Sequence, residues 1–456
     1  MRRTPPLRVL CYAINGLGLG HLTRLIAIGR QVRRLCWAVG QPLELAILTS
    51  SEGDALALVH GFPAFKIPSK NIVAEGGMEA HRYRKLGKQW VWNAINLFSP
   101  EILVVDTFPG GSFHELYEVL DLGSKNVFIC RAVRSEVASQ PAFQSALKGY
   151  DLILKPEEDG VNETPVPLSH EDRVVGVPPI LLRSVGETYS REQAREQLGI
   201  APEARAVYAS TGGGGDKDAE ALFSQLVTAA RQLPEIRFTL GAGMLYRGRE
   251  FPADNVVWTR RPVLSECFRA FDAAITAGGF NSVWELLHCG VPCLFLPLAR
   301  GWDDQEARVE RCIAAGAGGV LSALTAEAIR EGLAALPKTI PVLAAQNGAL
   351  AAAEAILALV IDPARLEQAA ELCDPAALFA AEQAGLREED VLRLASGLWH
   401  RSESPVPEDV LDAALWLAHR GHNVGKLLSV LRKQERGSDP RVIAEAAGAA
   451  LTEEQG

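Results

Sequence analysis

The segment 277–305 combines a glycine turn, a carboxylate among apolar residues and a group of polar residues that follows an apolar run. A short apolar run, 272–276, stops at Gly278 and Gly279, which is the pattern of a parallel strand that feeds a tight turn. We expect a helix directly after the turn, over 280–289. Glycine lets the backbone approach a ligand closely, and the first turn of a helix offers free N–H groups at the positive end of its dipole. The sequence therefore predicts a diphosphate site at this turn.

Glu285 lies about one and a half turns into the expected helix, too far along it to act as a cap. Its neighbours in the sequence are apolar, and an unpaired carboxylate on such a surface would be costly. The two hydroxyls of a ribose would satisfy it. Asp303, Asp304 and Gln305 follow the next apolar run, 291–298, at a strand end where open α/β sheets bind their ligands. These polar groups could hold the hydroxyls of a sugar.

A glycine turn near the amino terminus places a histidine where a base could work. The turn 15–20 (NGLGLG) follows an expected strand at 8–14, and His21 begins the helix expected over 21–32. A dinucleotide fingerprint would need glycine at the position of His21, and an acidic residue about 20 positions on, which is missing. An imidazole can take a proton from a hydroxyl or from water near neutral pH. The alternative is that His21 caps the helix or braces the turn.

Asp106 is the rival base. It ends the apolar run ILVVD, 102–106, again at the carboxyl end of a strand. Its carboxylate could instead orient His21 or cap the helix that follows. Thr23 and Arg24 are expected to support His21 or to face a phosphate.

A further glycine turn, 210–215 (STGGGG), lacks the Gly-Lys-Ser/Thr ending of a P-loop. We expect it to offer backbone N–H donors to a phosphate. Asp216 and Asp218 have the spacing of a metal-binding Asp-x-Asp pair, but at a helix start acidic residues complement the dipole. The sequence therefore predicts no metal site.

These motifs resemble those of GT-B glycosyltransferases, particularly the peptidoglycan N-acetylglucosaminyltransferase branch and related predicted bacterial transferases. The turn GGFNS at 278–282, the helix glutamate and the Asp-Gln pair resemble the donor-binding region, and DTFPGG at 106–111 is similar to a turn of the predicted transferases. GLGHLTR at 18–24 resembles the acceptor-facing turn, whose histidine is the base in some branches. The same motif is also similar to one in nucleotide-sugar hydrolases of nonulosonate synthesis.

The resemblance implies that the GGFNS turn receives the diphosphate, that Glu285 binds the ribose, and that Asp304 and Gln305 contact the donor sugar. The catalytic candidates are His21 and Asp106. The residues predicted to contact the nucleotide sugar are Gly18, Gly20, Ser210, Thr211, Gly212, Gly213, Trp258, Gly278, Gly279, Asn281, Ser282, Glu285, Asp304 and Gln305.

The fold class implied is α/β, with two Rossmann-like domains that face a cleft and an all-α carboxy-terminal extension. The expected limits are 1–180 for an acceptor domain, 181–360 for a donor domain and 361–456 for the helical extension. Parallel strands are expected at 8–14, 43–48, 102–106, 126–130 and 152–154 in the first domain, and at 205–209, 237–241, 255–258, 272–276 and 293–297 in the second. The segment 174–179 is expected to link the two.

The predicted activity is metal-independent transfer of a hexosyl or N-acetylhexosaminyl group, with inversion, from a UDP-linked sugar. The nucleotide sugar is a substrate, so no cofactor is expected, and the acceptor could be a glycan, a lipid-linked sugar or a small molecule. Three alternatives stay open: a nucleotide-sugar hydrolase with water as acceptor, a related epimerase, and a non-catalytic nucleotide-sugar-binding protein. The last would keep the donor pocket without needing His21.

Composition narrows the classes of partner. The 456 residues carry a net charge of −9, which argues against a nucleic-acid partner because phosphate binding needs a basic face. Eight scattered cysteines in a chain of this length indicate a reducing cytoplasm rather than a disulfide framework. The resemblance to predicted bacterial transferases implies a bacterial protein. No signal peptide or transmembrane segment is evident. The stretch 81–98 mixes basic residues with Trp and Phe and could contact a membrane peripherally, but a helix that covers a sheet is the preferred interpretation.

Overall fold

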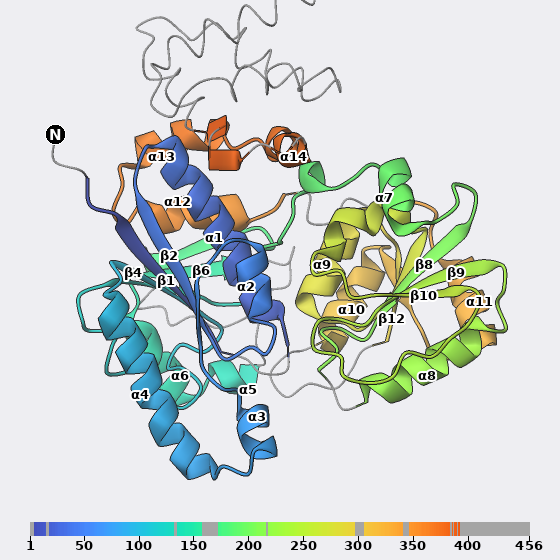
Figure 1. Ribbon diagram of the computed structural model, residues 1–456, viewed down its shortest axis with the longest axis horizontal. Coiled ribbons are helices and arrows are strands. Elements are labelled where there is room, and N and C mark those ends of the chain that lie inside the picture. Colours follow the sequence, from blue (N-terminus) through green and yellow to red (C-terminus); the bar gives the residue numbers. More distant parts are fainter. Residues whose placement is uncertain are drawn as a thin grey trace, which may run out of the picture.

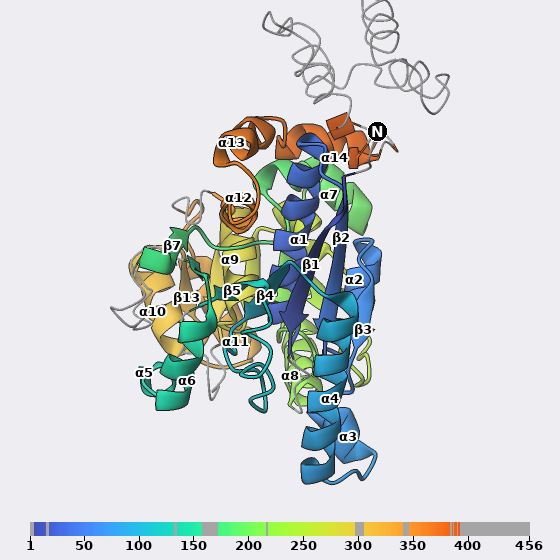
Figure 2. The same ribbon diagram turned by 90° about the vertical axis from the view of Figure 1, so that its left-hand side faces the viewer.

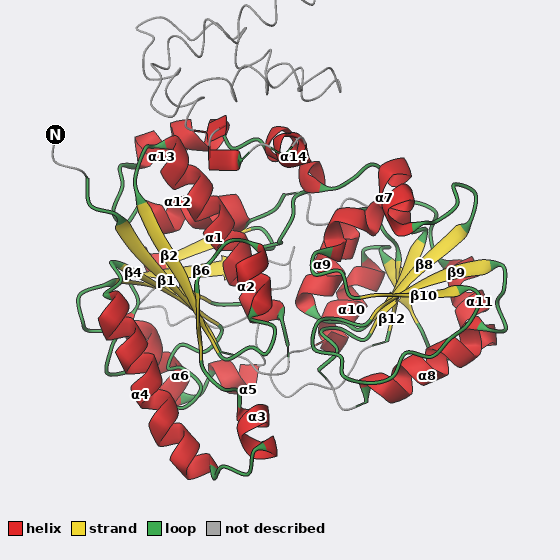
Figure 3. Ribbon diagram, viewed as in Figure 1, coloured by secondary structure: helices red, strands yellow, loops and turns green. Residues whose placement is uncertain are grey.

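The computed structural model describes residues 4–14, 18–131, 135–156, 172–215, 218–296, 305–340, 346–383, 385, 387–389 and 391–392. Figure 1 shows two α/β domains side by side, the first drawn mainly in blue and cyan and the second in green and yellow. In each domain helices enclose a parallel sheet, as the colouring by secondary structure in Figure 3 makes plain.

Seven parallel strands form the first sheet, in the order β3-β2-β1-β4-β5-β6-β7. The central strands β1 (Leu7–Ala13) and β4 (Ile102–Asp106) are almost wholly buried, because both are apolar runs covered by helices on the two faces. Helix α1 (Gly20–Ala38) covers one face and α4 (Ala80–Phe98) the other. The remaining elements are β2 (Leu43–Thr49), α2 (Ala55–Val59), β3 (Ala64–Lys66), α3 (Lys70–Glu75), β5 (Lys125–Ile129), α5 (Ser135–Ala138), α6 (Pro141–Ala146), β6 (Leu152–Pro156) and β7 (Val174–Val177).

Six parallel strands form the second sheet, in the order β10-β9-β8-β11-β12-β13. Helix α9 (Phe280–His288) lies on one face and α8 (Ala219–Ala230) on the other. Strands β8 (Arg205–Ser210) and β11 (Ala273–Thr276) are neighbours, so the glycine turns that follow them share one edge of the sheet. The remaining elements are α7 (Arg191–Leu198), β9 (Ile236–Gly241), β10 (Val256–Thr259), η4 (Leu264–Ala270), β12 (Cys293–Phe295), α10 (Gln305–Ala314), β13 (Gly318–Val320) and α11 (Ala326–Ala335).

The ten strands expected from the sequence are present, with ends that agree within two residues wherever the structure describes them. It adds β3, β7 and β13, which are short edge strands. Strand β7 lies in the segment expected to link the domains, where it pairs with β6 instead. The α/β class with two parallel-sheet domains is confirmed.

After the second domain the chain returns to the first. Helices α12 (Ala349–Leu357), α13 (Pro363–Glu371) and α14 (Pro375–Gln383) follow one another, and the side chains of α12 lie in the core that α1 shares with the first sheet. Figure 2 shows α12 beside α1, with α13 above it. The sequence assigned 349–360 to the second domain, whereas the described structure packs α12 against the first. Residues beyond 392, most of the expected helical extension, lie outside the described residues.

The two passages of chain between the domains are tied together by Asn347. Its side-chain oxygen accepts from the Leu181 N–H at 3.0 Å, and its side-chain nitrogen donates to the Leu181 carbonyl at 2.9 Å. Gly348 donates its N–H to the Pro179 carbonyl at 2.9 Å. A Cβ at Gly348 would lie 1.9 Å from the Pro178 carbonyl oxygen, so only glycine allows this approach of the two backbones.

A buried cluster of charges lies beside this double passage. The Glu187 carboxylate is fully buried and accepts from Arg30 and Arg34 of α1, each at 2.7 Å. Arg34 also pairs with Glu388, and Arg183 lies 3.5 Å from Glu187. The cluster therefore joins the first domain, the passage between domains and the carboxy-terminal helices.

Helix α4 covers the first sheet. Its buried residues Tyr83, Gly87, Val91 and Ile95 recur every four positions, which is the spacing of one helix face. Trp90, on another face, is 40% exposed. Among the described residues, none of the helices is both long and apolar enough to cross a bilayer. All eight cysteines are free, and seven of them are buried.

Candidate active site between the two domains

His21 and Asp106, which the sequence offers as rival bases, are in direct contact. Strands β1 and β4 are neighbours in the first sheet, so the start of α1 and the end of β4 meet at one edge. His21 Nδ1 lies 2.6 Å from Asp106 Oδ2, and the ring of His21 stacks on Phe108 with 5.4 Å between centroids. Asp106 is fully buried.

Arg24 fixes the charge of this carboxylate. Its Nε donates to Asp106 Oδ1 at 2.8 Å and its Nη2 to Asp106 Oδ2 at 2.9 Å, while the Thr107 hydroxyl lies 3.1 Å from Oδ2. Burial by itself would raise the pKa of the Asp106 carboxyl, but Arg24 and His21 outweigh it and hold that pKa well below its usual range. Asp106 is therefore an anion at neutral pH.

The surroundings of His21 favour its neutral form. Burial lowers the pKa of His21, and the positive charges of Arg131 and Arg24 lower it further, against the opposing effect of Asp106. An ionised carboxylate can only accept, so Nδ1 of His21 carries the proton and Nε2 is left with a free lone pair for a substrate. Arg131, which follows β5, was not singled out from the sequence. Only its position after a parallel strand could have indicated it.

The donor turn predicted at 278–282 lies against the first domain. Asn281 Nδ2 is 3.5 Å from the Gly20 carbonyl at the start of α1, and the Arg24 guanidinium lies over the Phe280 ring, 5.4 Å from its centroid. A Cβ at Gly278 would lie 2.9 Å from Gln305 Cβ, so glycine allows α10 to pack on the turn. Gln305 is therefore close to the turn, while Asp304 lies outside the described residues.

A cavity of about 180 Å³ lies between these elements. A Cβ at Gly213, in the turn after β8, would be 3.5 Å from the Leu19 backbone nitrogen, so the glycine turns of the two domains face one another. Eight of the residues predicted to contact the nucleotide sugar or to support His21 line the cavity, namely Gly20, Thr23, Ser210, Gly212, Gly213, Asn281, Ser282 and Glu285.

Glu285 faces this cavity from the middle of α9. Burial raises the pKa of the Glu285 carboxyl to about 7, and the backbone N–H of Leu182 lowers it only in part. Among the described residues, no side chain donates a hydrogen bond to this carboxylate. A carboxylate in this state gains most from a ligand that donates hydrogen bonds to it.

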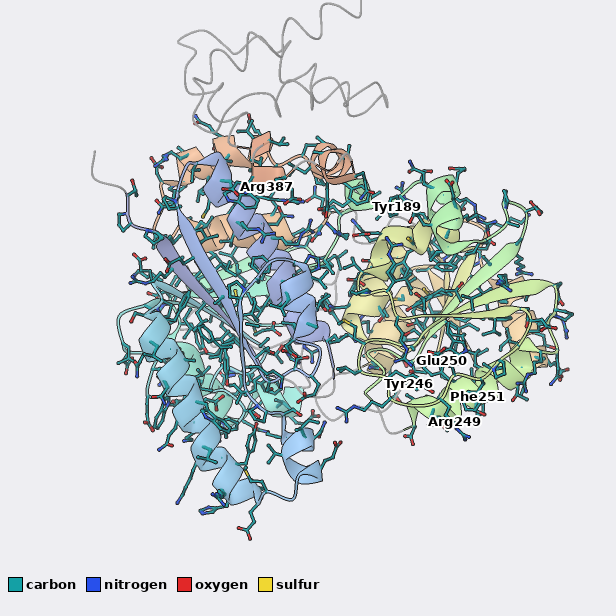
Figure 4. The ribbon with its side chains drawn as sticks, in the orientation of Figure 1. Tyr189, Tyr246, Arg249, Glu250, Phe251 and Arg387 are labelled. Carbon is teal, nitrogen blue, oxygen red and sulfur yellow. The ribbon has the colours of Figure 1, made fainter. Side chains whose placement is uncertain are left out.

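Several predicted residues lie elsewhere. Trp258 packs among Phe223 and Tyr246, and its indole N–H donates to the Phe251 carbonyl at 3.1 Å. It is absent from the cavity lining, and Figure 4 shows its neighbours Tyr246 and Phe251 on the α8 side of the second domain. Thr211 is also outside this lining, and its buried hydroxyl oxygen has no hydrogen-bond partner among the described residues.

The structure adds lining residues that the sequence analysis did not name. These include Tyr208, Arg261 and Ser265 of the second domain and Leu182 of the passage between domains. Arg261 also pairs with Glu266 at 3.2 Å. A sequence signal existed only for Tyr208, which lies in the strand before the STGGGG turn.

Within the described part of the chain, no group of three or more His, Cys, Asp and Glu side chains is placed to hold a metal ion.

Comparisons with known proteins agree on the architecture. Neither a scan of family models nor a search of curated proteins finds a match. The structure is similar to the glycotransferase of kitacinnamycin, with a TM-score of 0.50 and 16% identity over 84% of this chain and all of that one. It is also similar to the spinosyn forosaminyltransferase SpnP, with a TM-score of 0.51 and 17% identity over 80% of this chain and all of that one. This chain has the GT-B fold.

A third solved structure with this fold is the UDP-GlcNAc 2-epimerase from Neisseria meningitidis bound to UDP-GlcNAc, with a TM-score of 0.53 and 12% identity over 78% of this chain and 99% of that one. Transferases and an epimerase thus share the GT-B fold with this chain. The reaction must be argued from the site.

Proposed function

We propose that this protein is a glycosyltransferase that moves a sugar from a nucleoside diphosphate to a hydroxyl acceptor. The observation that carries the proposal is the contact between His21 and Asp106 at the start of α1. Gly20 and Thr23 of the same helix line the cavity that Glu285 lines from the other domain, although His21 and Asp106 are not themselves among its lining residues. A neutral imidazole beside a donor pocket is the arrangement that a general base requires.

The roles of the two rival bases follow from their surroundings. Both oxygens of Asp106 already accept from Arg24 and His21, and the carboxylate is fully buried, so it is poorly placed to take a proton from a substrate. We assign it the task of orienting His21 and stabilising the imidazolium. His21 Nε2 would then take the proton of the acceptor hydroxyl.

The reaction proposed is a single displacement. As His21 accepts the proton, the acceptor oxygen forms a bond to the anomeric carbon, and the bond from that carbon to the diphosphate oxygen breaks. Its electron pair leaves with the nucleoside diphosphate. Because attack and departure are in line, the anomeric centre is inverted.

Donor binding is proposed to use the second domain. Glu285 would accept from the ribose hydroxyls, and the backbone N–H groups of Gly213 and of the start of α9 would meet the diphosphate. These fixed donors could stabilise the departing charge without a metal ion. A UDP-linked hexose or N-acetylhexosamine is the donor that we propose.

The test is a donor screen followed by product analysis. Calorimetry with UDP-, dTDP- and GDP-sugars identifies the donor, and mass spectrometry of the reaction mixture then shows where the sugar goes. Sugar found on an acceptor supports transfer. Free sugar would indicate a hydrolase, an altered sugar on the nucleotide an epimerase, and binding without turnover a non-catalytic protein.

His21→Ala is the matching variant, with His81→Ala as its control because His81 is exposed on α4. Turnover that is lost in the first variant and kept in the second supports the assignment of the base. Equal turnover in both would refute it.

A further inference from the structure

Arg24 is a buried arginine that lies next to the His21–Asp106 pair. It lies on α1, one turn after His21, and is only 2% exposed. A buried guanidinium needs partners for its donors, and two of its N–H groups go to the two oxygens of Asp106. The pair is a bidentate contact within the first domain.

The same guanidinium reaches the second domain. It lies over the ring of Phe280, which is the first residue of α9 and only 5% exposed. Arg308 lies over the same ring at 5.6 Å and donates to the Gly278 carbonyl at 2.7 Å. The donor turn, Phe280, Arg24 and Asp106 therefore form a continuous set of contacts that ends at His21.

We propose that Arg24 is a positioning residue that links the placement of the donor turn to the orientation of the His21–Asp106 pair. This inference rests on the proposed function and deepens it. When Phe280 packs on Arg24, the guanidinium is held in the plane that allows both bonds to Asp106. The base would be fully ordered only when the two domains are together.

The charge of Arg24 predicts the direction in which the pKa of His21 should change when Arg24 is replaced. The charged groups that act on His21 are Asp106 at the end of β4, Arg24 on α1 and Arg131 after β5. Phe280, the residue of α9 that faces Arg24, is uncharged. Removing the positive charge of Arg24 should therefore raise the pKa of His21, so that the imidazole is protonated over a wider range of pH. The acid limb of the pH–rate profile should move to higher pH.

The experiment compares Arg24→Gln and Arg24→Lys with Arg33→Gln as control. Arg33 lies on the same helix, and its guanidinium packs over Phe62 at 4.4 Å, away from Asp106. In Arg24→Gln we expect kcat to fall about 10- to 100-fold, as expected for the loss of one or two charge-assisted hydrogen bonds. Donor affinity should change less than about twofold. Arg24→Lys keeps the charge and should restore the acid limb but not the full rate.

The link between Arg24 and the donor turn is tested by Phe280→Leu, alone and combined with Arg24→Gln. If Arg24 acts through Phe280, Phe280→Leu should lower kcat in the wild type and have little further effect when Arg24 is already Gln. Fully additive losses would overturn the link. An unshifted acid limb in Arg24→Gln would overturn the positioning role.

A measurement without substrate separates this inference from the proposed function. Nuclear magnetic resonance of the imidazole nitrogens, with the His21 signals assigned by their loss in His21→Gln, gives the tautomer and the pKa directly. We expect Arg24→Gln to raise the pKa of His21 whether or not a donor is found. If the pKa is unchanged the inference fails, and if it rises while no donor binds only the proposed function fails.

Discussion

Replacing Glu285 by glutamine should stabilise the protein and weaken its binding of a nucleotide. Burial raises the pKa of this carboxyl from 4.5 to about 7, so ionising it in the folded protein is unfavourable. The pKa of Glu285 is higher in the folded protein than in the unfolded chain, so the protonated carboxyl contributes to stability. This contribution is complete below pH 4.5 and is lost as the pH rises through about 7. A shift of this size corresponds to about 3 kcal/mol. Glu285→Gln, which cannot ionise, should gain up to that amount at pH 8.5 and little at pH 4.5.

The effect on binding has the opposite sign. Ribose hydroxyls donate to the ionised carboxylate, so the affinity of the wild type for UDP should rise with pH through about 7. Glutamine offers one weaker acceptor, and the loss should be about 1–3 kcal/mol at pH 8.5, or roughly 5- to 150-fold in Kd. The affinity of the variant should depend little on pH.

Urea unfolding at pH 4.5 and 8.5 and calorimetry with UDP at the same values measure both effects. Glu196→Gln is the control, because Glu196 is exposed on α7 of the same domain and is not among the residues that line the cavity. The reasoning is refuted if Glu285→Gln gains no stability at pH 8.5 or binds UDP as well as the wild type does.

Four further results are expected. His21→Ala should lower kcat by about 10²–10⁴ and leave donor affinity nearly constant in calorimetry. If His21→Ala keeps its activity while Asp106→Asn is inactive, Asp106 is the base and His21 is not. EDTA should leave turnover intact, and strict dependence on added Mg²⁺ or Mn²⁺ would contradict the proposed electrostatics. Glu187→Ala should cost about 3–5 kcal/mol in urea unfolding, because it leaves buried arginines without their anion. Gly348→Ala should lower Tm, because its Cβ would meet the Pro178 carbonyl oxygen. An unchanged Tm would show that the two chain segments between the domains can move apart without loss of stability.

The sequence predicted the fold class and ten strands because parallel strands buried on two faces are apolar runs that end at turn residues. The sequence did not indicate that α12 packs against the first domain. The residues of that helix, ALAAAEAIL, are apolar on most sides, so periodicity does not indicate which sheet they cover. The short strands β3, β7 and β13 lie at sheet edges, where few side chains are buried.

The site was predicted in part. The sequence named His21 and Asp106 but left open whether they compete or cooperate, because their contact depends on β1 lying beside β4, and chain order does not give sheet order. Trp258 illustrates a different limit. An aromatic residue at a strand end can face a ligand or pack on its own domain, and only the positions of Phe223 and Tyr246 decide between them.

The return of α12 to the first domain has a consequence for the order in which the molecule folds. The first sheet is complete when β7 leaves the ribosome, but about 170 residues separate its end from the start of α12. At about 5–20 residues per second, the face of α1 that packs on α12 stays uncovered for roughly 10–30 s, while the whole second domain is synthesised. During that time the face of α1 that α12 later covers is open to solvent or to a chaperone. The first domain to emerge is therefore the last to be finished.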